Sequence, residues 1–248
     1  CFLLKCEEDT REEWSNILWR ASSCLMLGGG IGIDYSVLRP SGRSLSRTGG
    51  ISSGPLPLMQ MVNEVGRNVM QGGSRRSAIY ASLNWQHEDI EQFLTMKNWE
   101  NIPVLDSNLG AVKHSNFNFP APLDMTNISV NYDDAAGRLN DPFTFDFNNS
   151  IFLKNCEQAM RTGEPGFSFN FGDKQNETAR NACTEVTSSD DSDVCNLGSI
   201  NLGNISSLDR FKLVVNLASK FLVCGTVRAD LPYDKVRQVR EKNRRLGL

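Results

Sequence analysis

The residues best suited to chemistry lie in one short segment, Asn181-Ala182-Cys183-Thr184-Glu185. The segment places an amide, a thiol and a carboxylate at alternate positions. In an extended loop, this spacing points all three side chains the same way, so that a hydrogen-bond donor, a sulfur and a base converge on one small substrate. Taken alone, the pattern also fits a surface loop with an incidental cysteine, so its interpretation depends on the other motifs.

Two further thiols stand at the heads of apolar segments. Cys195 begins Cys-Asn-Leu-Gly-Ser-Ile-Asn-Leu over residues 195–202, and Cys1 begins Cys-Phe-Leu-Leu. The alternative for Cys195 is an ordinary buried strand cysteine, and the alternative for Cys1 is a mere end residue. The remaining cysteines fall on helix or strand patterns and are expected to serve packing: Cys6, Cys24, Cys156 and Cys224.

Composition excludes several classes of function. The 248 residues suffice for one large domain or two small ones, and 26 basic residues are balanced by 29 acidic ones without a long basic run, which disfavours a nucleic-acid surface. No apolar run approaches the ~20 residues of a membrane span. Seven irregularly spaced cysteines with two histidines favour neither a zinc site nor a secreted disulfide framework. A cytoplasmic protein without a bound metal is expected.

Hydrophobic periodicity predicts alternating strands and helices, which is typical of an α/β fold with parallel pairing. Strands are expected near residues 1–4, 31–35, 78–83, 127–130, 167–171 and 195–202. Helices are expected near residues 10–27, 57–70, 88–94, 151–162, 209–223 and 232–245. Residues 39–55 and 71–76 read as glycine-rich loops, and residues 97–126 as irregular.

Local signals fix the ends of the first helix. Thr10 and Glu13 have the spacing of a capping box, and Gly28 is suited to end the helix. The glycines of Gly28-Gly29-Gly30-Ile31-Gly32 do not form a dinucleotide-binding fingerprint, because Tyr35 stands where its last glycine is needed. Their expected role is to let the backbone approach a substrate closely.

Taken together, eight separated motifs resemble the catalytic chain of ribonucleotide reductases, in the family's order: CFLL, GGGIGI, LRPSG, SSGP, QGGSRR, NISV, NACTE and CNLGSINL. The resemblance covers essentially the whole chain. It implies a ten-stranded α/β barrel made of two parallel half-barrels with a central finger loop. Residues 1–248 would then form a partial barrel domain that supplies the first half and the finger, and the C-terminal half-barrel would be missing.

The resemblance implies reduction of ribonucleotides to 2′-deoxyribonucleotides for DNA precursor synthesis. Cys183 would carry a thiyl radical that abstracts the 3′-hydrogen of the ribose. Glu185 would act as general base on the 3′-hydroxyl, and Asn181 would orient the substrate. Cys1 and Cys195 would supply two electrons and end as a disulfide.

The resemblance also implies binding sites. Gly30 matches a substrate-contact position, and Asp9 and Arg39 match residues that bind a deoxynucleotide or ATP effector. Residues 43–48 would form a first effector loop. Residues 71–76 would form a second, in which Gln71 and Arg76 would read the substrate base.

Partners and cofactor follow from the same resemblance. The substrate would be a ribonucleoside di- or triphosphate, which the sequence leaves open, and a thioredoxin-type protein would serve as reductant. A homodimer is expected, with its contact made by helices 10–27 and 57–70. The rest of the reductase chain is expected as a further partner of this segment. Two segments, QGGSRRSAIYASLNW and LDMTNISVNYDD, are more similar in sequence to reductases that depend on adenosylcobalamin. They are less similar to the class that takes its radical from a separate metal-containing subunit.

Two rival functions remain at this point. Another thiyl-radical barrel, such as a glycyl-radical lyase, is disfavoured because such enzymes typically use adjacent cysteines. A non-catalytic fragment that binds nucleotides and dimerises would describe the isolated segment, which is expected to lack turnover. The chain begins with Cys1 instead of Met, so we expect an internal segment, bounded either by protein-splicing junctions or by a truncated gene.

Overall fold

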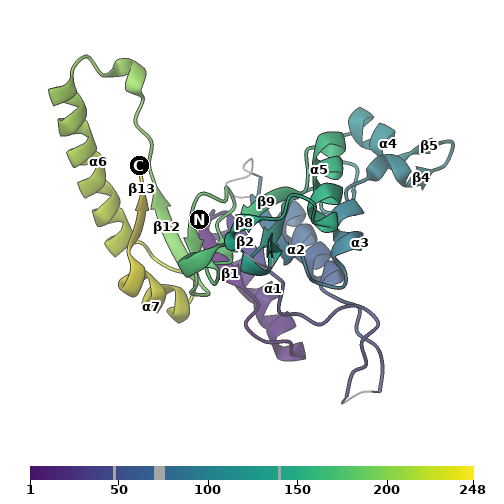
Figure 1. Cartoon of the computed structure of the whole chain (residues 1–248). Helices are drawn as coiled ribbons and strands as arrows, with labels where there is room; N and C mark the ends of the chain where they lie inside the picture. The colour runs from purple at the N-terminus through teal and green to yellow at the C-terminus, as the bar shows by residue number, and fades with distance from the viewer. Residues whose placement is uncertain (47–48, 70–75, 139–140) are drawn as a thin grey trace.

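Five parallel strands form the centre of the fold (Figure 1). The computed structural model describes residues 1–46, 49–69, 76–138 and 141–248. The parallel strands, in their order across the sheet, are β1 (Phe2–Lys5), β2 (Ile31–Asp34), β3 (Ile79–Asn84), β6 (Thr126–Tyr132) and β9 (Gly166–Phe169). The expected α/β class with parallel pairing is therefore confirmed for this part of the sheet.

Two further strands extend the sheet beyond β1 and add one antiparallel pairing to it. Strand β12 (Asp193–Leu197) runs antiparallel to β1, and β13 (Arg245–Gly247) runs parallel to β12. The predicted strand 195–202 thus begins earlier and ends at Leu197. The last predicted helix ends at Asn243, because Arg244 adopts a left-handed φ of 47° and the chain then joins the sheet.

The helices lie where periodicity placed most of them. They are α1 (Arg11–Met26), α2 (Leu56–Asn68), α3 (Ile90–Thr95), α4 (Leu109–Ser115), α5 (Ser150–Thr162), α6 (Leu208–Arg228) and α7 (Asp234–Asn243). The described residues also contain three small antiparallel strand pairs: β4 (Pro103–Val104) with β5 (Ser107–Asn108), β7 (Gly137–Arg138) with β8 (Asp141–Phe145), and β10 (Ala179–Arg180) with β11 (Thr187–Ser188).

The ends of α1 follow their local signals, with one difference. The Thr10 hydroxyl accepts a hydrogen bond from the Glu13 backbone N–H at 3.1 Å, and Gly28 follows the helix with a left-handed φ of 90°. The capping box is only half formed, because the Glu13 carboxylate accepts from the Glu7 N–H and the Arg20 guanidinium instead. A buried ion pair with Arg20 thus takes the place of the local contact.

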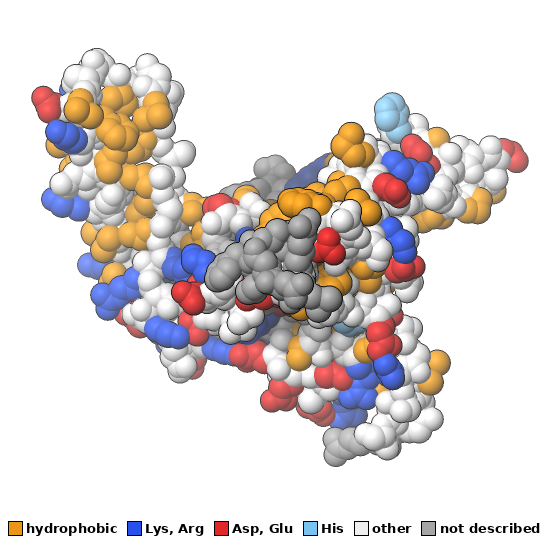
Figure 2. Space-filling model, viewed as in Figure 1, with side chains coloured by type: hydrophobic (Ala, Val, Ile, Leu, Met, Phe, Trp, Pro, Cys, Tyr) orange, Lys and Arg blue, Asp and Glu red, His pale blue; other side chains and the backbone are white. Residues whose placement is uncertain are grey.

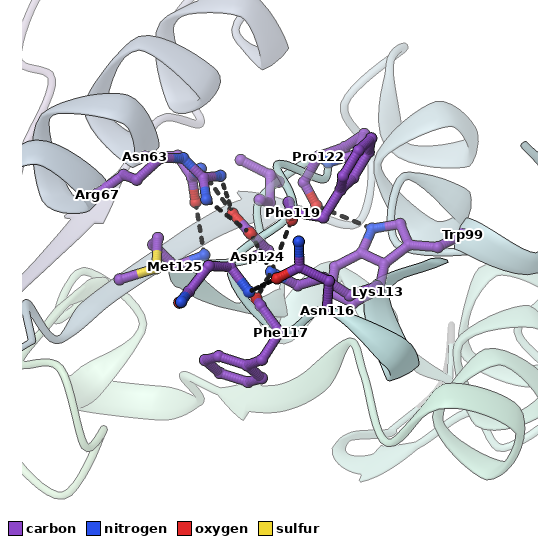
Figure 3. Close-up of polar contacts among 12 residues, drawn as sticks. Asn63, Arg67, Trp99, Lys113, Asn116, Phe117, Phe119, Pro122, Asp124 and Met125 are labelled. Carbon is purple, nitrogen blue, oxygen red and sulfur yellow. Dashed lines mark hydrogen bonds and ion pairs between the residues drawn. The ribbon is translucent and has the colours of Figure 1, made fainter. Parts of the chain in front are cut away.

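Residues 97–126 are more ordered than predicted, because they contain α4 and a buried ion-pair network (Figure 3). The buried Asp124 carboxylate accepts from Asn63 and Arg67 of α2 and from Lys113 of α4. Burial acts to raise the pKa of Asp124, but these hydrogen bonds hold it below its ordinary value. This network fastens the segment to α2, and its partners lie too far apart in sequence to be read from local pattern.

The two faces of the sheet differ in chemistry. One face packs against the helices and forms the main core with side chains that include Ile31, Ile33, Ile79, Ala81, Ile128 and Val130. The alternate positions carry buried polar groups: Asp34, Tyr80, Ser82, Ser129, Asn131 and Ser168. Period-two alternation sends the two sets to opposite faces. A polar but buried face must be covered by a further part of the chain.

Helices α6 and α7, with β12 and β13, form an arm that extends away from the parallel strands (Figure 1). Hydrophobic side chains gather along this arm (Figure 2). The exposed ones on α6 are Leu208, Phe211, Leu213, Leu217, Phe221, Val223 and Val227. Cys224 is also exposed, which corrects its expected packing role. No helix in the described part of the chain is long and apolar enough to cross a lipid bilayer.

Candidate active site

The hairpin β10–β11 carries the Asn-x-Cys-x-Glu segment across the buried polar face of the sheet, beside β1 and β2. Its seat is shaped by glycines. A Cβ atom on Gly32 would lie 2.0 Å from the Arg180 carbonyl oxygen, and a Cβ on Gly30 would lie 3.0 Å from the Ala182 Cβ. Only glycine at position 32 therefore lets the hairpin lie this close to β2. The close approach at these two glycines is to the hairpin, and at Gly30 also to Ala78, whereas the approach expected from the sequence was to a substrate.

The close contact between the hairpin and β2 predicts that stability is sensitive to substitution of Gly32. Gly32→Ala is expected to lower the free energy of unfolding by about 1–3 kcal/mol, because backbone must move to admit the methyl group. Gly203→Ala is the matched control, since its new Cβ would meet only the Asn201 side chain. Thermal unfolding of the full-length protein measures both changes, and equal melting temperatures would contradict the close contact.

The hairpin tip is a tight turn, which differs from the extended loop expected from the spacing. Thr184 adopts a left-handed φ of 69°, and its N–H donates to the Asn181 carbonyl at 3.0 Å. The turn folds the segment back, so that the buried Asn181 amide donates to the Glu185 carboxylate at 2.7 Å. Cys183 stays exposed near the tip. The amide and the carboxylate thus meet through the turn, with the thiol between them in sequence.

Cys1 and Cys195 stand directly opposite each other where β12 meets β1. The Cys195 N–H donates to the Cys1 carbonyl at 3.0 Å, and the Cys1 amino nitrogen donates to the Cys195 carbonyl at 3.1 Å. A hydrogen-bonded antiparallel pair has Cα atoms about 5.5 Å apart, which is within the range that a disulfide spans. The expected proximity is confirmed. Both thiols are free in this structure.

The hairpin and the cysteine pair share one environment. A small hydrophobic cluster joins them and consists of Leu3, Ala179, Cys195, Cys1 and Val186. Burial raises the pKa of the Cys195 thiol, and the Glu185 and Asp193 carboxylates act in the same direction. Val186, the residue that follows Glu185 in the hairpin, thus packs in the same cluster as the buried thiol.

Asp193, which the sequence motifs did not single out, ties this region together. Its fully buried carboxylate accepts from Ser188 Oγ at 2.6 Å, Asn243 Nδ2 at 2.7 Å and Arg245 Nε at 2.6 Å. These donors come from β11, α7 and β13. An acid two residues before Cys195 in a buried strand was the available signal, since a buried charge needs such partners.

The expected effector residues meet at the start of α1. Arg39 and Asp9 form an ion pair, and the Arg39 guanidinium also donates to the Ser44 carbonyl at 3.3 Å. Both residues line an open cavity of about 360 Å³ together with Thr10, Arg11, Trp14 and Leu45. The structure thus brings Asp9 and Arg39 together. Gln71 lies outside the described residues.

Arg76 lies in a different place from this cavity. Its guanidinium sits 4.3 Å from the centre of the Phe117 ring and donates to Asn118 at 3.2 Å. It lines a second cavity, of about 310 Å³, with Arg67, Lys113 and Phe117 among its walls. Within the described residues, no group of three or more histidine, cysteine or acidic side chains is arranged to hold a metal ion.

A family model described as the barrel domain of ribonucleotide reductase matches residues 1–118 and 148–248. The chain belongs to the ribonucleotide reductase family. The curled mixed α/β sheet and the hairpin on its polar face agree with a barrel domain of this family.

Similar proteins span all or most of the chain. A vitamin B12-dependent ribonucleoside-diphosphate reductase of Thermoplasma acidophilum is 30% identical over 270 residues, covering 100% of this chain and 33% of the relative. A reductase of the same description from Mycobacterium tuberculosis is 28% identical, covering 100% and 37%. A putative adenosylcobalamin-dependent ribonucleoside-triphosphate reductase of Mycobacterium phage D29 is 28% identical, covering 87% and 35%. The chain thus spans about a third of the length of these relatives.

Proposed function

We propose that the protein containing this chain reduces ribonucleotides to 2′-deoxyribonucleotides by a thiyl-radical mechanism. The observation that carries the proposal is the opposed Cys1–Cys195 pair, packed beside a hairpin that holds Asn181 against Glu185 and carries Cys183 near its tip. A two-electron reductant, a base and a third thiol are the groups that this reaction requires. Family membership supports the same assignment.

Each residue then has a defined task. Cys183, as a thiyl radical, removes the ribose 3′-hydrogen, and Glu185 takes the 3′-hydroxyl proton as general base. Cys1 and Cys195 supply two protons and two electrons and become a disulfide: one proton leaves with the 2′-hydroxyl as water, and the other goes to the 2′-carbon. Glu185 returns its proton to the 3′-oxygen, and Cys183 returns the 3′-hydrogen. Asn181 orients Glu185 and the substrate by hydrogen bonding.

The direct test is a reductase assay on the full-length protein with ribonucleoside di- and triphosphates as separate substrates. Deoxynucleotide formation that requires a dithiol reductant supports the proposal and also identifies the substrate class. Tight deoxynucleotide binding without turnover, under conditions in which a related reductase is active, would instead favour a non-catalytic nucleotide-binding protein.

The radical source is proposed to be adenosylcobalamin, as the names of the similar proteins state for those proteins. The alternative is a radical passed from a separate metal-containing subunit. Adenosylcobalamin would supply the one-electron oxidant for a thiol. Cys183 fits such a partner because it is the exposed cysteine of the hairpin, so a group from outside this segment can approach it.

Allosteric control is proposed at the cavity beside α1. A deoxynucleotide or ATP would break the ion pair between Arg39 and Asp9. Arg39 would then bind phosphate oxygens, and Asp9 would bind the sugar hydroxyl. The cavity's aromatic and aliphatic walls, from Trp14 and Leu45, suit the remainder of the nucleotide. Ligand-dependent changes in Trp14 fluorescence would report occupancy.

Arg76 is expected to act on base preference. Arg76→Ala in the full-length protein should change the ratio of turnover between favoured and disfavoured bases by about fivefold or more across effectors, with a smaller change in total turnover. The side chain contacts Phe117 and Asn118 from the described end of the second loop, so its loss alters that end without touching the thiols. Arg237→Ala is the control, on an exposed face of α7. Unchanged base ratios would remove Arg76 from this role.

The partners are proposed from surfaces that this chain leaves open. The groove between α1 and α2 has an apolar lining that includes Leu18, Trp19, Met61 and Val65, and it suits a homodimer contact between two such helix pairs. The exposed apolar face of α6 suits coverage by the rest of a reductase chain, given the relatives' greater length. A thioredoxin-type protein would reduce the Cys1–Cys195 disulfide, in the reducing environment of the cytoplasm.

A further inference from the structure

One cation joins the hairpin tip to the sheet. Arg180 Nη1 donates to the Thr184 carbonyl at 3.2 Å, across the turn that carries Cys183. Its Nη2 donates in the other direction, to Asn170 Oδ1 at 2.9 Å and the Phe169 carbonyl at 3.3 Å. A planar guanidinium is suited to this task, because its rigid fork serves acceptors on two sides at once.

The acceptor at the tip is the strained residue of the turn. Thr184 is β-branched and adopts a left-handed φ of 69°, a conformation that persists only where the surroundings hold it. Cys183 and Glu185 are its two chain neighbours. A hydrogen bond to the Thr184 carbonyl fixes the peptide plane that leads into Glu185, and the bond from the Thr184 N–H to the Asn181 carbonyl fixes the plane that follows Cys183.

Asn170, which accepts from Arg180 at the end away from the tip, is held in place by its surroundings. Asn170 is 2% exposed, and its N–H donates to the Tyr132 carbonyl at 2.8 Å, which continues the pairing of β9 with β6. The Arg180 backbone is itself held, because its carbonyl lies against Gly32 of β2. The Arg180 backbone thus lies against β2 while its guanidinium reaches acceptors at the end of β9, and the same guanidinium holds the tip.

We propose that Arg180 is a positioning residue for the reaction, which sets the direction of the Cys183 thiol and the Glu185 carboxylate by holding the Thr184 carbonyl. The inference rests on the proposed reductase function. Hydrogen abstraction and proton removal both need short, aligned contacts with the ribose. A displacement of about 1 Å at such a site lowers the rate about a hundredfold.

Steady-state kinetics of the full-length protein test the proposal. Arg180→Ala is expected to lower kcat about 30- to 100-fold while KM changes less than about threefold, because the substrate-binding surface is kept and the reacting groups are misplaced. Arg180→Lys is expected to lie near the alanine variant, since an ammonium cannot serve both sides. Added guanidinium at millimolar concentration should restore part of the kcat of Arg180→Ala and none of that of Arg180→Lys. Arg161→Ala, on the exposed side of α5, is the control.

The outcomes separate the two hypotheses. A wild-type protein that forms no deoxynucleotide with either substrate class refutes the proposed function. An active wild type with an unchanged kcat in Arg180→Ala refutes the positioning role alone. If Arg180 has only a general structural role, Arg180→Ala should weaken effector binding and lower the melting temperature along with kcat, and guanidinium should not restore kcat. That result would also overturn the proposal.

Discussion

Replacing Cys183 by serine in the full-length protein is expected to abolish ribonucleotide reduction. An alkoxyl radical cannot be generated where a thiyl radical can, because the serine O–H bond is much stronger than the cysteine S–H bond. A barrier higher by about 4 kcal/mol already lowers a rate about a thousandfold, so we expect at least that loss. The product is measured as deoxynucleotide formed per active site over many hours.

The matched control is Cys224→Ser, because Cys224 is also exposed and lies on α6, away from the hairpin. It should retain wild-type turnover. Binding of substrate to Cys183→Ser should also persist, since the contact of Asn181 with Glu185 does not involve the thiol. Substantial turnover by Cys183→Ser would remove this cysteine from the radical role.

Replacing either of the opposed cysteines is expected to stop repeated turnover, for a different reason. Cys195→Ser, or Cys1→Ser, leaves one thiol that cannot close into a disulfide, so we expect dithiol-dependent turnover to fall about a hundredfold or more. In the wild type, turnover without added reductant should stop after about one product per site. Peptide mapping should then find Cys1 and Cys195 joined, as their pairing across β1 and β12 permits.

Cys156→Ser serves as control for this experiment, because Cys156 lies on α5 outside the cluster around the hairpin. Its disulfide yield and turnover should equal those of the wild type. A different disulfide after turnover, or full multiple turnover in Cys195→Ser, would contradict the assignment of the reducing pair.

Much of the fold could be predicted from the sequence because it depends on interactions between residues close together in the chain. The Thr10 cap and the left-handed Gly28 follow from backbone groups within a few residues, and the alternation on β2, β3 and β6 follows from the two-residue period of a strand. The Asn-x-Cys-x-Glu segment was visible because its chemistry is compressed into five residues. Such features need no distant partner and can be read from sequence.

Other features depend on groups that are far apart along the chain. The ordering of residues 97–126 rests on Asp124 meeting Arg67 and Lys113, and the tight hairpin tip rests on Arg180 meeting the end of β9. Thr184 in a left-handed turn contradicts local preference, so the extended spacing predicted the wrong route by which Asn181 and Glu185 meet.

The sequence by itself determined the reactive groups and the α/β class, because side-chain chemistry and strand period are local. Only the tertiary structure decided that β12 runs antiparallel to β1, and it is this reversal that sets Cys195 opposite Cys1 across 194 residues of chain. Strand direction is fixed by which surfaces can be buried together, and that depends on the packing of the whole domain.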